Sequence, residues 1–420
     1  MTSRPGRLLA LGGLLVLAPS PALAQTPSLP APLTLERAVD RFLARNLAVE
    51  AARHRVDIAR AERLAAGLRP NPTLTLEAED VKLSGPTPAG DLYQVTSSVS
   101  YPIELGDKRR LRVEAADASV ALAEARLADV LQQRLADLKR AFYDVLLARA
   151  TREHALETRQ TFDALVEFNQ VRLDEGDVAE AELIKARLER GKQDTALTQA
   201  DLAVRQAGIK LLDLLGESDF SSAGTVTGTL DVTAALPPLD ELRATALRER
   251  ASLQAAQHAA ALAARRVALE RARATVDVSP FLGLRRVGEN NTVLFGISIP
   301  LPVYDRNQGG IARAVAEEKA ADAELALERA RVLAEIESSW HAWQTARAQA
   351  AVFERDLLPQ AEESRAIALA AYREGAIGLV EYLEAQRTLA GLRQQYARSL
   401  FDAHAARLFL EQAVGRDLGR

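Results

Sequence analysis

The sequence predicts a mainly α-helical chain of long antiparallel coiled-coil helices, carrying two membrane β-hairpins that arose with the helices by internal duplication. Three observations lead to this fold class: one stretch too long for a globular helix, paired segments of alternating polarity, and recurrence of the whole order. The long stretch, residues 107–173, contains no glycine or proline. As one helix of 67 residues it would measure about 100 Å, whereas helices of globular proteins average about 11–12 residues.

An apolar seam runs along this stretch. Its residues are spaced alternately four and three apart, which is the pattern of a coiled coil. The residues of the seam are Leu131, Leu135, Leu138, Phe142 and Val145.

The N-terminus has the features of a secretory signal peptide over residues 1–24. Arg4 and Arg7 are followed by an apolar run, residues 8–18, and by a small-residue cleavage site, Ala22-Leu23-Ala24. The run is too short for a transmembrane anchor. The chain has no cysteine, so disulfides, thiolate chemistry and a lipid anchor on an N-terminal cysteine are excluded.

Composition excludes several classes of function. The net charge of −4 gives no basic footprint for nucleic acid. No nucleophile–base pair or phosphate loop indicates an enzyme, and no cofactor is expected. The five histidines lack the paired spacing of metal ligands, and they are scattered over different predicted helices. They are His54, His154, His258, His341 and His404.

The first repeat, residues 35–215, follows a proline-rich leader, residues 25–34. Thr34 is a candidate N-cap, and Pro70-Asn71-Pro72 ends the first helix. The expected elements are a helix over 35–69, a β-hairpin over 73–101, the long helix over 107–173, a turn at Glu175-Gly176-Asp177 and a helix over 178–215.

In the second strand of the first hairpin, Tyr93, Val95, Val99 and Tyr101 share one face and polar residues share the other. The two tyrosines are roughly 27 Å apart along a strand, which suits the aromatic girdles at the two membrane interfaces. A soluble hairpin with one buried face is the alternative.

A linker, residues 216–238, leads to the second repeat, residues 239–414, and a tail, residues 415–420. Asp107-Lys108 matches Asp305-Arg306 at an offset of 198 residues, and Glu175-Gly176 matches Glu374-Gly375 at 199. Both aspartates are expected to cap helices, and Pro359 is expected to kink the second long helix. The expected elements are a helix over 239–275, a hairpin over 276–301, a long helix over 305–373 and a helix over 377–414.

The helix lengths predict how the elements pack. The helices over 35–69 and 178–215 together are about as long as the long helix, so we expect them to stack end to end beside it. Both hairpins then lie at one end of a rod, both glycine turns at the other, and the linker at the waist. Four strands of about 9–11 residues are long enough to cross a bilayer but cannot close a barrel, and open edges are not tolerated in lipid. The chain should therefore oligomerise.

Three motifs resemble the TolC family of outer-membrane efflux channels, and the likeness covers essentially the whole mature chain. They are Gly-Leu-Arg-Pro-Asn-Pro at residues 67–72 and the two strand-to-helix junctions, Val-Ser-Tyr-Pro-Ile-Glu-Leu-Gly-Asp-Lys-Arg at 99–109 and Ile-Ser-Ile-Pro-Leu-Pro-Val-Tyr-Asp-Arg-Asn-Gln-Gly at 297–309. The second junction is most similar to the CzcC-like branch, which serves heavy-metal cation efflux pumps.

This resemblance implies a homotrimer with a twelve-stranded β-barrel in outer-membrane lipid and an α-helical tunnel in the periplasm of a Gram-negative cell. It also implies a periplasmic adaptor (membrane fusion protein), an inner-membrane pump of the resistance-nodulation-division type, and a channel that conducts passively. A drug-efflux or type I secretion channel of the same family is an alternative. A periplasmic coiled-coil adaptor or scaffold belongs to a different class and does not explain the two hairpins.

The resemblance also assigns roles near the glycine turns. Glu381 and Glu384 share a helix face, and Glu182 matches Glu381 in the first repeat. Acidic residues there would ring the periplasmic entrance and favour cations; an ordinary solvated face is the alternative. Lys185 matches Glu384, and a latch between the two is conceivable. The expected adaptor-docking residues are Gly176, Asp177, Gly375 and Ala376.

Overall fold

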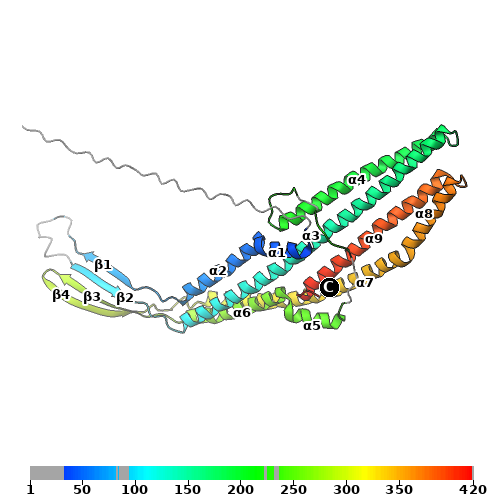
Figure 1. Cartoon of the computed structure of the whole chain (residues 1–420). Helices are drawn as coiled ribbons and strands as arrows, with labels where there is room; N and C mark the ends of the chain where they lie inside the picture. The colour runs from blue at the N-terminus through cyan, green and yellow to red at the C-terminus, as the bar shows by residue number, and fades with distance from the viewer. Residues whose placement is uncertain (1–32, 82–83, 85–93, 222–224, 231–235, 419–420) are drawn as a thin grey trace, which may run out of the picture.

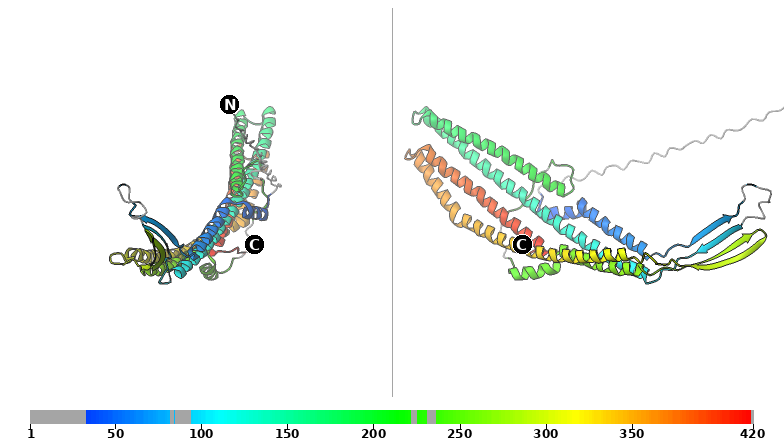
Figure 2. Two further views of the ribbon diagram at one scale, coloured as in Figure 1. Left: turned by 90° about the vertical axis from the view of Figure 1, so that its left-hand side faces the viewer. Right: turned by 180° about the vertical axis from the view of Figure 1, so that it is seen from behind.

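The computed structural model describes residues 33–81, 84, 94–221, 225–230 and 236–418. The predicted signal peptide, nearly all of the leader, Tyr93 and parts of the 216–238 linker lie outside the described residues. The chain is an elongated, bent rod with a β-sheet at one end and two helical hairpins at the other (Figures 1 and 2).

Helices make up most of the described chain, and each repeat contains one long helical path. In the first repeat they are α1 (Leu35–Arg45), α2 (Leu47–Gly67), α3 (Lys108–Asp174) and α4 (Glu180–Leu214). In the second they are α5 (Leu239–Glu249), α6 (Ala251–Arg273), α7 (Gln308–Val352), the π-helix η2 (Phe353–Leu357), α8 (Leu358–Arg373) and α9 (Leu379–Val414). None of them is both long and apolar enough to cross a membrane.

Two helices that the sequence predicted as continuous are each broken in two. The helix expected over 35–69 breaks at Asn46, whose side chain accepts hydrogen bonds from the N–H groups of Ala48 and Val49 and so caps α2. The helix expected over 239–275 breaks at Arg250. The prediction failed because apolar periodicity continues across both breaks.

The ends of the short helices meet at the waist, as the helix lengths predicted. α2 and α4 both pack along α3, one toward each end. The Asn46 side chain donates a hydrogen bond to the Leu214 carbonyl oxygen at 2.9 Å, which joins the break in α1–α2 to the end of α4. Gly216, with φ +71°, leaves no room for a Cβ because the Arg45 oxygen would lie 2.9 Å away. Gly415, with φ +97°, lies in the same way against the Glu249 oxygen, which confirms the duplication.

The second long helix is interrupted rather than only kinked. The π-helix η2 separates α7 from α8, and Pro359 lies in the first turn of α8. Because proline lacks an N–H and crowds the preceding turn, an interruption at this point is expected, and it begins before the proline itself.

The predicted aspartate caps are wrong. Asp107 occupies the N-cap position of α3 but has φ 59° and makes no side-chain cap bond; its carboxylate pairs with Arg110 at 3.0 Å. α7 begins later than expected, after Asn307 at φ 59°, and Asp305 accepts a hydrogen bond from the Asn307 N–H. In both cases the sharp strand-to-helix corner requires a left-handed residue where an extended cap was expected.

The two hairpins form one antiparallel sheet in the order β1-β2-β3-β4. The strands are β1 (Thr73–Glu79), β2 (Gln94–Ser100), β3 (Ser279–Val287) and β4 (Asn290–Ser298). β1 and β2 have 7 residues each, fewer than predicted; β1 ends at Glu79 because Asp80 takes φ 58°. Within the described residues β1 and β4 each have one unpaired edge.

One face of the sheet is apolar and exposed to solvent. The strand register places Leu74, Val99, Leu282 and Phe295 in one row, and their exposed fractions are 61%, 49%, 62% and 82%. A soluble sheet buries such a row against a core. The open apolar face therefore favours lipid over the soluble-hairpin alternative.

Candidate functional site at the helical tips

The two turns at the far end of the rod are the predicted glycine turns. Gly176 has φ +82° and Gly375 has φ +73°. The N–H groups of Asp177 and Ala376 donate hydrogen bonds, each at 2.8 Å, back to carbonyl oxygens of the preceding helix, which is a Schellman-type helix end. All four residues are exposed, so the turns form the outermost surface of both hairpins (Figure 1).

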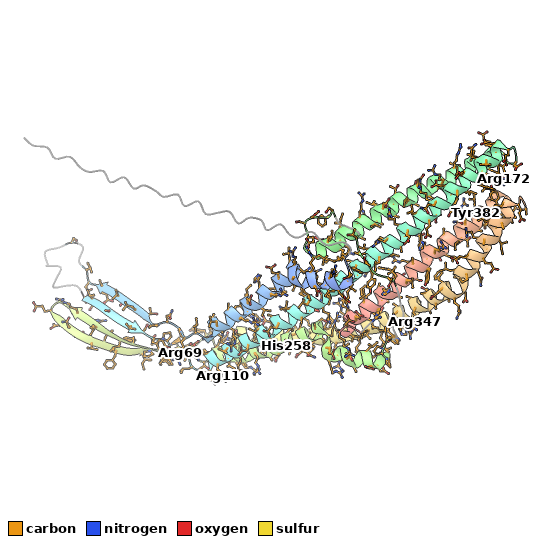
Figure 3. All side chains as sticks on the ribbon, viewed as in Figure 1. Arg69, Arg110, Arg172, His258, Arg347 and Tyr382 are labelled. Carbon is orange, nitrogen blue, oxygen red and sulfur yellow. The ribbon has the colours of Figure 1, made fainter. Side chains whose placement is uncertain are left out.

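An aromatic cluster joins the two hairpins just behind the turns. Tyr372 of α8 stacks on Tyr382 of α9, with ring centroids 5.7 Å apart and an angle of 6° between planes. The Arg172 guanidinium of α3 lies 5.6 Å from the centre of the Tyr372 ring, and Figure 3 shows Arg172 and Tyr382 at this end. The buried residues of the cluster are Phe162, Leu165, Ala186, Tyr372, Leu379, Tyr382 and Leu383.

A buried hydrogen bond ties the second hairpin to α3. The Tyr372 hydroxyl donates to the Asn169 side-chain oxygen at 2.5 Å, and the Asn169 amide donates to the Leu165 carbonyl oxygen at 2.9 Å. Asn169 has no exposed surface and Tyr372 has 1%. Burial raises the pKa of Tyr372 above its ordinary value, and the nearby Glu182 carboxylate acts in the same direction. The neutral phenol is therefore held as a donor.

The Tyr372–Asn169 pair was not predicted, although the sequence contains a signal for Asn169. Asn169 follows Phe162 and Leu165 at seven and four residues' distance, so it occupies a seam position of the coiled coil. A polar residue at such a position usually fixes a specific pairing.

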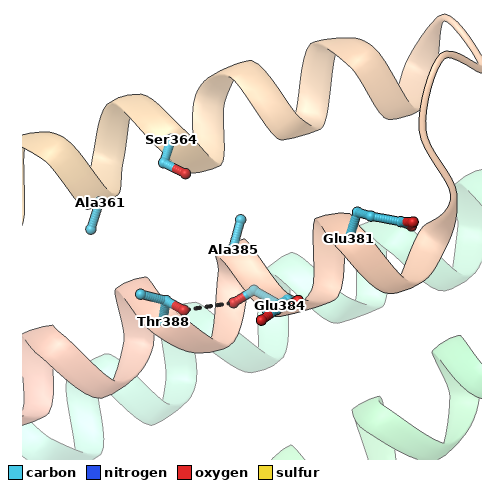
Figure 4. Close-up of a pocket in the computed structure, with 6 residues that line it drawn as sticks. All are labelled: Ala361, Ser364, Glu381, Glu384, Ala385 and Thr388. Atoms are coloured by element: carbon cyan, nitrogen blue, oxygen red, sulfur yellow. Dashed lines mark hydrogen bonds between the residues drawn. The ribbon is translucent and has the colours of Figure 1, made fainter.

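The predicted entrance carboxylates are placed on two different hairpins. Glu381 and Glu384 are exposed on one face of α9, where they line a shallow groove of about 270 Å³ between α8 and α9 (Figure 4). Glu182, in the first turn of α4, is half-buried. One chain thus brings Glu381 and Glu384 together but does not form a ring. The residues that line the groove are Ala361, Ser364, Glu381, Glu384, Ala385 and Thr388.

An ion pair joins α4 to α9, but it is not the Lys185–Glu384 latch considered from the sequence. Within the described part of the chain neither of those two residues forms an ion pair. Instead, Arg387 contacts the buried Glu189 carboxylate at 2.5 Å. Burial opposes ionisation of Glu189, but hydrogen bonds from Lys192 and Arg387 outweigh it and lower its pKa. The sequence did not predict this pair, because a glutamate flanked by other charged residues of a helix is expected to be exposed to solvent.

Among the described residues no group of three or more His, Cys, Asp or Glu side chains is placed to hold a metal ion.

Comparison with known proteins identifies relatives of the whole chain. The model of the family described as "Outer membrane efflux protein" matches residues 38–217 and 242–416, which correspond to the two repeats. A match over both repeats favours a channel over the adaptor or scaffold alternative.

Two metal-resistance proteins of Cupriavidus metallidurans are similar in sequence. The cobalt-zinc-cadmium resistance protein CzcC is 30% identical over 92% of this chain and 90% of its own length. The nickel and cobalt resistance protein CnrC is 29% identical over 67% of this chain and 66% of its own length.

A solved structure has the same fold. The outer membrane protein VceC of Vibrio cholerae superimposes with a TM-score of 0.77 at 21% identity, covering 92% of this chain and 97% of that one. Long helices with a small antiparallel sheet are therefore the fold of this chain.

We predict that Tyr372 and Asn169 are energetically coupled. Tyr372→Phe leaves a buried acceptor unpaired, and such a loss costs about 1–3 kcal/mol. In a double-mutant cycle with Asn169→Ala, the free energies of unfolding should be non-additive by about 0.5–3 kcal/mol. Thermal unfolding of the four proteins measures this coupling, and additive effects would contradict it. Val171→Ala, an exposed position on the same helix, serves as the control.

Proposed function

Because the chain belongs to the outer membrane efflux protein family, we propose that it is the exit duct of a tripartite pump that passively conducts heavy-metal cations out of the cell. As a member of this family it is a channel and not an enzyme. The observation that carries the metal assignment is the similarity to CzcC over almost the full length of both chains. The duct would lie in the outer membrane and extend into the periplasm.

The sheet supports assembly as a homotrimer. One chain supplies 4 strands with unpaired edges at β1 and β4, and an unpaired edge in lipid costs several kcal/mol for each unsatisfied group. Pairing β4 of one copy with β1 of the next removes every edge when three copies close into a twelve-stranded barrel. The apolar row containing Leu282 and Phe295 then faces lipid, and the opposite, more polar face lines the lumen.

We predict that deletion of the gene makes a metal-resistant host more sensitive to divalent cations such as cobalt, zinc or cadmium. Plasmid-borne wild-type protein should restore resistance, and minimal inhibitory concentrations measure both effects. Drug sensitivity should be unchanged. Increased drug sensitivity with unchanged metal sensitivity would instead support a drug-efflux channel of the same family.

The entrance ring of Glu182, Glu381 and Glu384 follows from the trimer. Three copies would bring nine carboxylates to the periplasmic mouth, and rings of carboxylates favour cations. Glu381 and Glu384 are exposed, and within the described residues neither forms an ion pair. Their charges are therefore available to the passing ion.

We predict that Glu381→Ala combined with Glu384→Ala lowers cation selectivity. In planar bilayers under a salt gradient, the reversal potential of the double variant should move toward zero. Glu241→Ala, an exposed carboxylate of α5 at the waist, is the matched control and should leave the reversal potential unchanged. Identical potentials for all three proteins would exclude the ring.

We also propose that the turn residues Gly176, Asp177, Gly375 and Ala376 dock the periplasmic adaptor, which links the duct to an inner-membrane pump of the resistance-nodulation-division type. They are the outermost surface of both hairpins (Figure 1). A Cβ at either glycine would meet no atom within 4 Å, so the surface is open. The positive φ of both glycines makes substitution there strained in itself, and the neighbouring residues are therefore the better probes.

We predict that Asp177→Trp and Ala376→Trp each abolish metal resistance by blocking this contact. Trimers should still assemble and conduct in planar bilayers, because both side chains are exposed and outside the aromatic cluster. Resistance at the wild-type level would contradict docking at the turns. Loss of trimers would show a folding defect, in which case crosslinking of an Ala376→Cys variant to adaptor in cells decides the question.

A further inference from the structure

Within the strands, the polar face of the sheet carries charge only near the hairpin turns. The charged residues of the four strands are Glu77, Glu79, Arg285 and Arg286. Alternation and register place the first three on the face opposite the apolar row, and Arg286 on the apolar face. Glu77 and Arg285 lie in one row, and Glu79 lies in the next row toward the turns, at the end of the sheet farthest from the helices (Figure 1).

Closer to the helices the same face is uncharged. The two rows that begin at Thr73 and Thr75 contain threonine, serine, phenylalanine, glycine and leucine. The Phe281 ring lies over Gly296, where a Cβ would approach it to 2.5 Å. The proposed function places this face in the lumen, so an ion that has passed the lower barrel meets strand charges only at the outer mouth.

The Arg285 guanidinium leans over β2 toward the glutamates of β1. Its Nε donates a hydrogen bond to the Thr96 hydroxyl at 3.3 Å, and Thr96 is only 4% exposed. Thr96 lies between Glu77 and Arg285 in the row. Because neighbouring strands are about 4.8 Å apart, the backbones of Glu77 and Arg285 are roughly 10 Å apart. Within the described residues Arg285 forms no ion pair, so its charge lies beside the carboxylates without direct contact to one of them.

Carboxylates alone would bind a divalent cation at the mouth too well. Glu77 and Glu79, contributed by each of three copies, would give six carboxylates, and carboxylate oxygens are common ligands of divalent cations. Conduction requires a site that an ion can enter and can also leave. A wholly acidic mouth would therefore attract divalent cations and then retain them.

We propose that Arg285 sets the rate at which divalent cations leave the outer mouth of the duct, by weakening their binding to the ring of Glu77 and Glu79. The inference rests on the proposed function, which places the polar face of the sheet in the lumen of a trimer. Each copy contributes two carboxylates and one guanidinium, so the mouth keeps a net negative charge and still favours cations. Because repulsion grows with the charge of the ion, Arg285 acts more strongly on a divalent than on a monovalent cation.

Arg286 provides an internal comparison. It follows Arg285 in β3 but lies on the apolar face, where its Nε donates a hydrogen bond to the Gly288 carbonyl oxygen at 3.0 Å. The two arginines are neighbours in the same strand and have the same charge, but only Arg285 shares a face with the glutamates. A general effect of removing a cation from the barrel would be the same at both positions, whereas the proposed effect is specific to Arg285.

Block of potassium current by cobalt in planar bilayers tests the role of Arg285. The chain has no cysteine, so Arg285→Cys can be modified at one position, with either a neutral or a cationic thiosulfonate reagent. Both reagents cap the thiol, which removes it as a metal ligand, and they differ in the charge that they leave. The protein is added to one compartment, where its helices remain, and cobalt to the other, so that the ion reaches the outer mouth first. Arg286→Cys treated in the same way is the matched control.

We expect cobalt to block the neutral-capped Arg285→Cys channel at a concentration about five- to tenfold lower than the cation-capped one. The cation-capped channel should match wild type, and Arg286→Cys should give one blocking concentration with both reagents. Adding Glu77→Gln to the neutral-capped variant should raise the blocking concentration again, because it removes the carboxylate in the same row. If Arg285→Cys forms no channels, Arg285→Gln, which keeps an amide donor near Thr96, takes its place and should be blocked at a lower cobalt concentration than wild type.

Three outcomes would overturn the role of Arg285. If both capped forms are blocked at the same concentration, Arg285 does not weaken cation binding, although the channel itself stands. If Arg286→Cys shows the same difference between reagents, the effect does not depend on the polar face. If wild-type protein forms no potassium-conducting trimers, the proposed function fails together with the inference.

Discussion

The arrangement of the whole chain depends on the waist, where the short helices of each repeat meet end to end beside the long helix. At the waist, Gly216 packs against the Arg45 oxygen, and Gly415 packs against the Glu249 oxygen in the second repeat. Neither contact leaves space for a side chain, and both glycines require φ > 0. Because each path returns to the waist at this contact, the sheet and the turns are kept at opposite ends of the rod. The lengths of the helices then set the distance between the sheet and the tips.

Much of this architecture could be predicted from the sequence, because lengths and periodicities are local properties. The 67-residue helix, the glycine turns and the sheet faces needed only residue spacing. The breaks at Asn46 and Arg250 could not be predicted, since they depend on where α4 and α9 end in space. The failure at Asp107 has a similar cause. Capping rules assume an extended residue before the helix, and the corner from sheet to helix imposes a left-handed one.

At the tips, the sequence predicts which residues share a face of one helix. It does not predict which residues of different helices contact each other. Spacing alone places Glu381 and Glu384 on one face. The Tyr372–Asn169 hydrogen bond and the Arg387–Glu189 ion pair join residues about 200 positions apart, so they require the packing of the two hairpins. The first contact is buried on both sides, and the second joins a buried carboxylate to an exposed guanidinium; a buried polar group that loses its partner is costly. The two contacts hold the hairpins in one relative position, whereas the exposed carboxylates beside them contribute charge without fixing geometry.

The two repeats have the same order of helices and strands but differ in the contacts that hold the sheet to the helices. At the junction below the sheet, Arg112 of the first repeat binds Glu104 and the carbonyl oxygens at the end of α2; the matching position of the second repeat is Gly310. The long helix is continuous in the first repeat and interrupted by η2 in the second. π-Helical turns often occur at functional sites, and this interruption belongs to the second repeat. The first repeat therefore has the more regular long helix of the two, although both repeats contribute strands to the sheet.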